Sequence, residues 1–279
     1  MHSSPEPLVA RAWIALGTLV EIALPQSSAT EARFEAAFAA IGHVHRCMSP
    51  REPESDLARI ARDAHRGGVR VDRDTHAVLA LALEVWSVSG GAFDPTLGPR
   101  GGGLRALSFE PGVRVRASRA VSLDLGGIAK GHAVDRAIEA LAATGATWAV
   151  VNAGGDLRVL GDTRWHRVRV RHPIATSRLI PLCDLRDGAL ATSGAGFGST
   201  LVHPRTRRAC RVRDSISVAA ASCAVADALT KVVALAPRLA PRVLEHFGAQ
   251  AFVIDASGRA MRAGARPAGK LLQVAWAFA

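Results

Sequence analysis

The sequence contains no tyrosine, and phenylalanine and tryptophan together make up only 5% of it. Proteins that bind single-stranded nucleic acid commonly stack bases on aromatic side chains set among basic residues. The chain is basic, with a formal net charge of +11, but no stretch interleaves arginines with aromatics. The charge that would attract nucleic acid is present without the stacking residues, so we expect no nucleic acid partner.

Long apolar runs and paired cysteines are absent as well. No stretch approaches the roughly 20 apolar residues that cross a bilayer. The polar first residues have no apolar signal core and no cysteine to lipidate, which predicts a cytoplasmic protein for the chain as written. Four widely spaced cysteines fit no zinc pattern and favour free thiols in a reducing compartment: Cys47, Cys183, Cys210 and Cys223.

A length of 279 residues, 49% of them hydrophobic, is enough for one large domain or two. No repeat, low-complexity tract or linker divides the chain, so we predict a single domain over residues 1–279. Hydrophobic periodicity predicts helices at 30–45, 55–62, 74–89, 128–141, 221–235 and 239–247. It predicts strands around Gly17-Thr18 within 8–24, and at 121–125, 148–151, 157–160, 165–171, 179–185, 216–220, 251–254 and 271–276.

The stretch 121–135 carries the most chemistry for its length. A short alternating strand ends at the glycine pair 126–127, and a helical period then begins. Glycines before a helix let a ligand approach the backbone, and the free N–H groups of a helix start attract anions. Lys130 adds a positive charge in the first turn, so a phosphate could bind here. The alternative is a lysine neutralised by its neighbours Asp124 and Asp135.

A second acidic helix lies near the C-terminus. Asp227, Thr230 and Lys231 are spaced i, i+3 and i+4 and share one face. Alanines on both sides of Asp227 indicate close packing, and a buried carboxylate needs a cation, either the lysine or a metal. An exposed Asp–Lys pair is the alternative.

Two loops complete the set of candidate segments. The rigid loop from Gly91 to Gly103 contains Asp94, either a turn-forming aspartate or a ligand contact. Residues 203–213 are strongly basic, and form either a solvated loop or a site for acidic groups of a ligand.

Taken in order, these segments resemble the bacterial FAD:protein FMN transferases of the ApbE family. The resemblance covers nearly the whole chain and keeps the family's motif order. The matching segments are Leu16-Gly-Thr18, Ser49–Arg59, Phe93-Asp-Pro-Thr-Leu-Gly-Pro99, Asp124-Leu-Gly-Gly-Ile-Ala-Lys-Gly131, Asn152-Ala-Gly-Gly-Asp156, Ala191-Thr-Ser-Gly194, Pro204-Arg-Thr206 and Ala226-Asp-Ala-Leu229.

The resemblance implies an α+β fold with a tunnelling-fold-like core of antiparallel sheet and packed helices. It also implies FAD as substrate, magnesium, and transfer of FMN to a threonine hydroxyl of a target flavoprotein with release of AMP. Family members are often exported. By carry-over, FAD would contact Leu16, Ala92, Phe93, Asp94, Asp124 and Lys130. The metal would bind the Gly127 carbonyl, Asp227 and Thr230, and the catalytic candidates are His203, Asp227 and Lys231.

Three positions depart from the family pattern. Lys231 stands where the family has a metal-binding threonine, so its ammonium could occupy the place of the magnesium ion. Thr200 stands where a catalytic histidine is expected, and His203 could act instead. Arg51 stands at or near an expected tyrosine. Two alternatives to an active transferase therefore stay open. One is an FAD-binding relative with lost or altered metal-dependent catalysis, and the other is a basic protein that binds nucleic acid through the 203–213 arginines.

Overall fold

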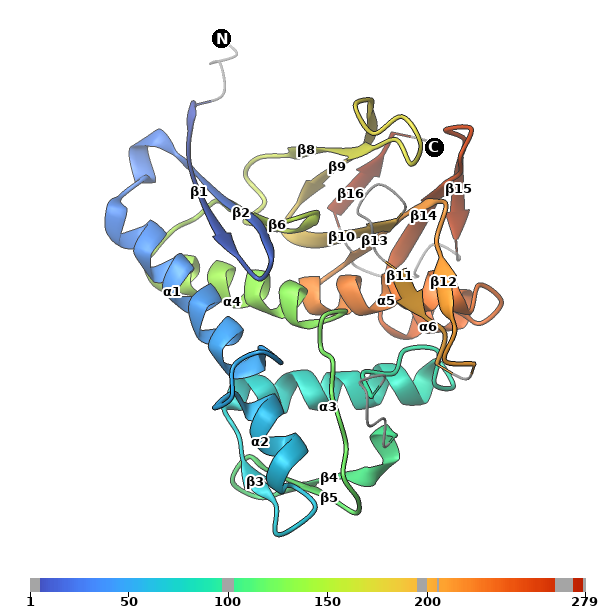
Figure 1. The fold of residues 1–279 in the computed structure, drawn as a ribbon. Helices are drawn as coiled ribbons and strands as arrows, with labels where there is room; N and C mark the ends of the chain where they lie inside the picture. The colour runs from blue at the N-terminus through green and yellow to red at the C-terminus, as the bar shows by residue number, and fades with distance from the viewer. Residues whose placement is uncertain (1–5, 97–102, 195–199, 205, 264–272, 278–279) are drawn as a thin grey trace.

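A computed structural model describes residues 6–96, 103–194, 200–204, 206–263 and 273–277 (Figure 1). Its main feature is an eight-stranded sheet in the order β1-β2-β6-β7-β10-β13-β14-β15. Every neighbouring pair in this sheet is antiparallel. The strands are β1 (Leu8–Ala15), β2 (Thr18–Pro25), β6 (Ala149–Ala153), β7 (Asp156–Leu160), β10 (Gly188–Gly194), β13 (Ser215–Ala220), β14 (Gln250–Ile254) and β15 (Ala260–Ala263).

A second sheet covers one face of the large sheet. Its order is β16-β9-β8, with β8 at His166–Arg171, β9 at Leu179–Arg186 and β16 at Gln273–Trp276. Side chains of both sheets pack between them, including Trp148, Leu157, Val168 and Leu182. This arrangement buries the apolar face of each sheet against the other.

Helices cover the opposite face. Helices α4 (Ala129–Ala143) and α5 (Cys223–Leu235) lie against β6, β7, β10 and β13, and α1 (Glu31–Met48) packs against α4 (Figure 1). Helix α3 (Arg73–Val88) contacts both α1 and α5, and the short α6 (Ala240–His246) packs beside α5. Buried side chains of these helices and of the sheet form the larger hydrophobic core.

Smaller elements lie at the edges of this layered body. Helix α2 (Asp56–Asp63) and a three-stranded sheet of β3 (Val69–Arg70), β5 (Arg114–Ala117) and β4 (Leu107–Glu110) lie beyond α3, at the bottom of Figure 1. Strands β11 (Thr200–Val202) and β12 (Ala209–Arg211) form a separate hairpin. Ser55 caps α2 by accepting a hydrogen bond from the Ala58 amide at 3.2 Å, as its position predicts.

Most predicted elements are confirmed, and the differences are local. Residues 121–125 are extended but pair with no strand of the described chain, so the strand predicted there is wrong. Their alternation reflects the burial of Val121, Leu123 and Leu125. Between them, the Asp124 amide donates a hydrogen bond of 2.7 Å to the Pro95 carbonyl in the loop after α3. The basic segment 203–213 contributes β12 to the small hairpin rather than forming only a loop. Residues 271–272 of the last predicted strand lie outside the described residues.

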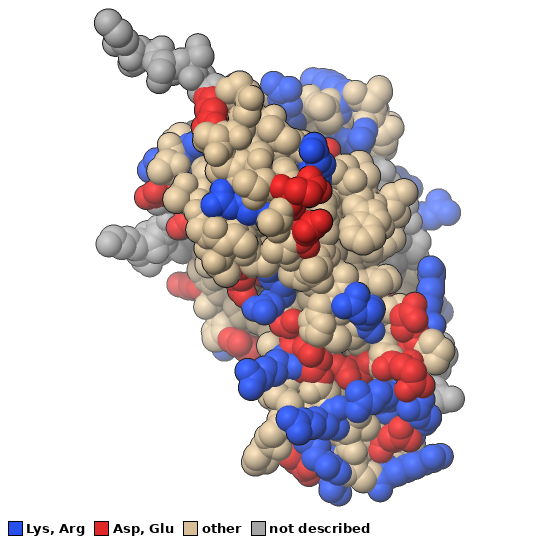
Figure 2. Space-filling view, turned by 90° about the vertical axis from the view of Figure 1, so that its left-hand side faces the viewer, with Lys and Arg blue, Asp and Glu red and all other residues tan. Residues whose placement is uncertain are grey.

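Basic and acidic side chains are mixed on the surface that Figure 2 shows. Ion pairs join Arg59 to Asp56, Arg62 to Asp63 and Arg116 to Glu110. On the face that Figure 2 shows, blue and red groups are interspersed and form no continuous basic stripe. No helix of the described ranges has both the length and the apolar character needed to cross a membrane.

Candidate functional site

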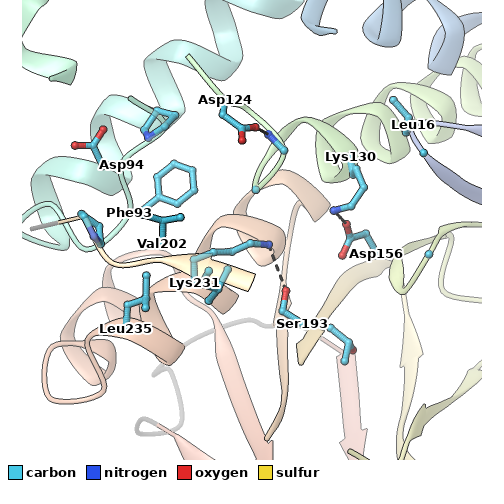
Figure 3. A pocket seen from close by; sticks show the side chains of 18 of the residues that line it. Leu16, Phe93, Asp94, Asp124, Lys130, Asp156, Ser193, Val202, Lys231 and Leu235 are labelled. Atoms are coloured by element: carbon cyan, nitrogen blue, oxygen red, sulfur yellow. Dashed lines mark hydrogen bonds and ion pairs between the residues drawn. The ribbon is translucent and has the colours of Figure 1, made fainter. Parts of the chain in front are cut away.

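A cavity of about 490 Å³ lies where the β1–β2 turn, the loop after α3, the start of α4 and the face of α5 meet. All the residues predicted to contact FAD line it: Leu16, Ala92, Phe93, Asp94, Asp124 and Lys130. Gly127 and Lys231 line it as well. Segments more than 200 residues apart in the sequence are therefore brought to one cavity, as Figure 3 shows.

Leu16 reaches the cavity from a strained turn. Its φ is 55° and that of Gly17 is 72°, so both central residues of the β1–β2 turn lie in the left-handed region. Two positive φ angles are typical of the tight turns that match the twist of a β-hairpin. A leucine is unfavourable there, because its Cβ crowds the backbone. Strain of this kind is often found at ligand sites.

The loop after α3 is held by side chains near its ends. The buried Ser89 hydroxyl accepts a hydrogen bond from the Phe93 amide at 3.3 Å. One carboxylate oxygen of Asp94 accepts from the Thr96 amide at 2.8 Å and from the Thr96 hydroxyl at 2.6 Å. Asp94 is thus a turn-forming aspartate and also part of the cavity wall. Residues 97–99 of this motif lie outside the described residues.

The first turn of α4 meets a carboxylate from within the protein. Its N-cap, Ile128, has no side-chain cap, and the Gly131 amide donates to Asp227 Oδ2 at 3.4 Å. The dipole of α4 therefore favours the charge of Asp227. Asp124 accepts from the Gly126 amide at 2.8 Å and fixes the glycine turn before the helix.

Lys130, Lys231 and Asp156 line the floor of the cavity, and the fully buried Asp227 lies beneath them without lining it. Lys130 Nζ lies 2.6 Å from Asp156 Oδ2 and 3.3 Å from Asp227 Oδ2. Lys231 Nζ pairs with Asp227 Oδ1, and it also donates to the Asp227 carbonyl at 3.1 Å and to the Ser193 hydroxyl at 3.3 Å. The two lysine side chains point toward each other from α4 and α5 (Figure 3).

Burial within this cluster is graded. The Asp227 side chain is fully buried, whereas 13% of the Lys231 side chain and 29% of the Lys130 side chain are exposed. Burial alone would raise the pKa of Asp227, but the ammonium groups of Lys231 and Lys130 hold it below its usual value. Burial would lower the pKa of Lys130, but the carboxylates of Asp227 and Asp156 raise it above its usual value. Lys130 therefore stays charged. The cavity therefore presents cations with their counter-charges beneath them.

Asp135 does not neutralise Lys130, so the alternative that named it is wrong. It accepts hydrogen bonds from the Cys223 and Ala224 amides at 2.8 and 2.9 Å, and it pairs with Arg158 at 2.7 Å. These are the first amides of α5, which no residue of that helix can satisfy. Asp135 thereby fixes the start of the helix that carries Asp227 and Lys231.

The residues predicted to bind a metal do not fit a divalent ion while Lys231 is in place. Both carboxylate oxygens of Asp227 and its carbonyl already accept hydrogen bonds from lysines. The buried Thr230 hydroxyl donates to that same carbonyl at 2.7 Å and contacts the Ser193 hydroxyl at 2.9 Å, rather than lining the cavity. A Cβ on Gly127 would lie 3.2 Å from Lys231 Cε, so the lysine stem fills the space beside the proposed carbonyl ligand. No reaction step is therefore assigned to magnesium.

His203 lies beside the cavity and not in its wall. Val202 and Pro204, its neighbours in the sequence, both line the cavity. The Nδ1 atom of His203 accepts a hydrogen bond from the Thr206 amide at 3.3 Å. In the neutral ring this bond leaves the proton on Nε2.

Several cavity residues were missed as individual site candidates, above all Asp156 and Ser193. Both belong to motifs that the sequence analysis identified, Asn152–Asp156 and Ala191–Gly194. A glycine turn after a buried strand indicates a backbone that can approach a ligand. It does not show which side chain faces Lys130 or Lys231 across the sheet.

The fold and cavity define an α+β protein similar to two solved ApbE structures. One is the ApbE protein of Thermotoga maritima, with a TM-score of 0.80, 24% identity, and 92% of this chain and 97% of that chain covered. The other is the flavin transferase ApbE of Vibrio cholerae, with a TM-score of 0.80, 22% identity, and 93% and 98% covered. At these identities the likeness shows the fold alone, and it confirms the predicted α+β class with a large antiparallel sheet and packed helices.

A family model described as the ApbE family matches residues 16–104 and 100–254, so the chain belongs to the ApbE family. Two curated proteins named FAD:protein FMN transferase are similar to it. That of Rhodobacter capsulatus is 31% identical over 86% of this chain and 55% of its own length. That of Treponema pallidum is 29% identical over 66% of this chain and 64% of its own length. The chain thus spans between about half and two thirds of these curated relatives.

Proposed function

We propose that this protein transfers FMN from FAD to a threonine hydroxyl of a target flavoprotein and releases AMP. The observation that carries the proposal is the convergence of all the predicted FAD contacts on one cavity whose floor holds two ammonium groups. Membership of the ApbE family and similarity to two proteins named FAD:protein FMN transferase support it.

The reaction needs stabilisation of charge rather than covalent chemistry by the protein. The acceptor oxygen attacks the phosphorus of the FMN half, the P–O bond to the AMP half breaks, and AMP leaves with the bridging oxygen. The hydroxyl proton passes to solvent. Fixed cations at the phosphate oxygens stabilise such a transition state. Among the described residues that line the cavity, the cations are Lys130 and Lys231.

The other site residues have positioning and binding roles in this proposal. Asp227 aligns the two lysines, because both of its oxygens accept their hydrogen bonds. Leu16, Ala92 and Phe93 offer apolar surface for the rings of FAD, while Asp94 and Asp124 offer carboxylate acceptors in the same wall. His203, a catalytic candidate from the resemblance, lies beside the cavity and not in its wall, so we assign it no contact with FAD.

The proposal is tested by incubating the purified chain with FAD and a threonine-containing fragment of a flavoprotein. We expect AMP by chromatography and a fluorescent acceptor band in a denaturing gel, in equal amounts. Lys130→Met should reduce both products at least tenfold. Arg238→Met, an exposed substitution outside the cavity, should leave both unchanged. Tight FAD binding without AMP, with several acceptors, would contradict the proposal.

One observation favours a second candidate, an FAD-binding relative with lost or altered metal-dependent catalysis. Lys231 occupies the oxygen ligands that a magnesium ion would need. In that case the cavity still binds FAD, and the dinucleotide stays intact. The same assay separates the two functions, because only the transferase produces AMP.

A nucleic acid partner is not proposed. In the β11–β12 hairpin the uncharged Ala209 and Cys210 pair with the cavity-lining Val202 and Leu201, and the basic Arg211 pairs with Thr200 beside them. The charge of Arg211 would attract an anionic substrate or an acidic surface of the target protein. We expect low salt to strengthen binding of the acceptor protein to this chain. We expect no binding of an oligonucleotide that low salt strengthens.

A further inference from the structure

Lys231 is held as a bound cation would be. Its nitrogen meets three oxygen atoms: Asp227 Oδ1, the Asp227 carbonyl and the Ser193 hydroxyl. A lysine ammonium has three N–H donors, so these oxygens account for all of them. Carboxylate, carbonyl and hydroxyl oxygens are also the ligands that magnesium prefers. One set of oxygens cannot hold both cations.

The lysine is built into this position and not merely close to it. Its i, i+4 spacing from Asp227 on α5 places both groups on the same face. Its stem passes Gly127, where any Cβ would lie 3.2 Å from Lys231 Cε and 3.4 Å from Phe93 Cε2. Asp227 is fully buried, so removing the ammonium would leave a buried charge with less compensation.

We propose that Lys231 is a covalently attached substitute for the divalent metal, so that the charges of two lysines, without a metal ion, attract the pyrophosphate of FAD to this cavity. The inference rests on the proposed function for the identity of the ligand. Its geometric part does not rest on it, because the lysine contacts of the three Asp227 oxygens are made by the chain itself.

The test has a metal readout and a flavin readout. Mn²⁺ binding is measured by electron paramagnetic resonance without flavin, and FAD affinity by flavin fluorescence in magnesium or in a chelator. The unchanged chain should bind no stoichiometric Mn²⁺ beyond any that Cys47→Ala removes, and its FAD affinity should differ less than twofold between the two conditions. Lys231→Thr should bind Mn²⁺ and gain at least a tenfold magnesium dependence of FAD affinity. Lys231→Met should lose affinity in both conditions, whereas Arg238→Met should not.

The outcomes separate this inference from the proposed function. Stoichiometric Mn²⁺ binding by the unchanged chain that persists in Cys47→Ala, or a tenfold loss of FAD affinity in chelator, would overturn the role of Lys231. Absence of FAD binding under all conditions would overturn the proposed function. Comparison of Mn²⁺ binding by the unchanged chain and by Cys47→Ala, which removes the separate His43–Cys47–Asp72 cluster, would still decide the inference.

A separate cluster, between α1 and the start of α3, points to a second site. His43 and Cys47 lie one turn apart on α1, and Asp72 is the N-cap of α3. His43 Nε2 lies 3.1 Å from Asp72 Oδ2, 3.7 Å from Cys47 Sγ and 3.7 Å from Asp74 Oδ2. Three groups therefore converge on one ring nitrogen, which has at most one proton to donate.

We infer that His43, Cys47 and Asp72 bind a zinc-type divalent ion. Their ligand atoms all lie within 4.8 Å of one another, close to the separations that tetrahedral zinc ligands require. A shallow hollow lined by Cys47 and Asp72 gives an ion access from solvent. Burial and the carboxylates of Asp72, Asp56 and Asp74 raise the pKa of Cys47 to about 11, and a bound cation would reverse that effect.

Titration with Co²⁺ tests this site, because a cobalt–thiolate bond gives a near-ultraviolet charge-transfer band. We expect the band in the unchanged chain and in Cys210→Ala, which removes another partly exposed thiol. It should be lost in Cys47→Ala and in His43→Ala. A band that survives in Cys47→Ala, or no band in the unchanged chain, would overturn the assignment.

Discussion

Asp135 should contribute more to stability than any other single polar side chain that supports α5. It satisfies the Cys223 and Ala224 amides, which are both buried, while Ser222 accepts from the Val225 amide. Asp135→Ala leaves two buried amides without an acceptor, and each such group costs about 1–3 kcal/mol. Arg158 is 25% exposed and can be solvated, so its lost ion pair adds little. We expect a loss of about 3 kcal/mol.

Thermal and urea unfolding measure this loss. A domain of this size loses about 2–4 °C in Tm per kcal/mol, so Asp135→Ala should unfold roughly 6–12 °C lower. Asp135→Asn, which keeps one acceptor, should lose about half as much. Glu139→Ala on the same helix removes an exposed pair with Arg136 and should cost no more than about 0.5 kcal/mol. An Asp135→Ala loss as small as that of the control would refute the reasoning.

Three further predictions concern packing, charge and the strained turn. Gly131→Ala should lower the free energy of unfolding, measured in urea, by about 1–3 kcal/mol, because its Cβ would lie 2.3 Å from the Cys223 carbonyl oxygen. A gain in stability would contradict the close contact between α4 and the start of α5. Burial and Asp227 raise the pKa of Asp156 to about 6, so it takes up a proton as the pH falls from 7 to 5. The site then gains positive charge, so FAD affinity should rise between pH 7 and pH 5. Asp156→Asn should make FAD affinity independent of pH in this range. FAD affinity of the unchanged chain that does not vary with pH would exclude a role for Asp156 protonation. Asparagine tolerates the positive φ of position 16, so Leu16→Asn should keep Tm within about 2 °C. It should weaken FAD binding several-fold, because the apolar side chain is lost. Unchanged FAD affinity would show that Leu16 does not contact FAD.

Short-range features of the site could be predicted from the sequence. The alanines around Asp227 indicated a buried carboxylate, and the i+4 spacing made Lys231 one of two possible cations beside a metal; the structure has Asp227 buried and paired with Lys231. The glycines at 126–127 indicated a turn before α4, which is also present. Each of these inferences depends on neighbours within one helical turn, where spacing determines geometry.

Contacts between distant segments could not be predicted in the same way. Lys130 pairs with Asp156 across 26 residues, and Asp135 caps a helix 88 residues away. Neither pairing leaves a local pattern, so the nearest carboxylates in the sequence were the wrong partners for Lys130. The strand predicted at 121–125 failed for a related reason, because alternating burial beneath a loop has the same period as a strand in a sheet.

Mass spectrometry of an acceptor protein tests the account most directly. The chain is incubated with FAD and a threonine-containing acceptor, once with magnesium and once with a chelator. The account predicts an acceptor heavier by one FMN group and an equal amount of AMP, in both conditions. Intact FAD and an unmodified acceptor in both conditions would contradict the transferase, and products that need magnesium would contradict the role of Lys231.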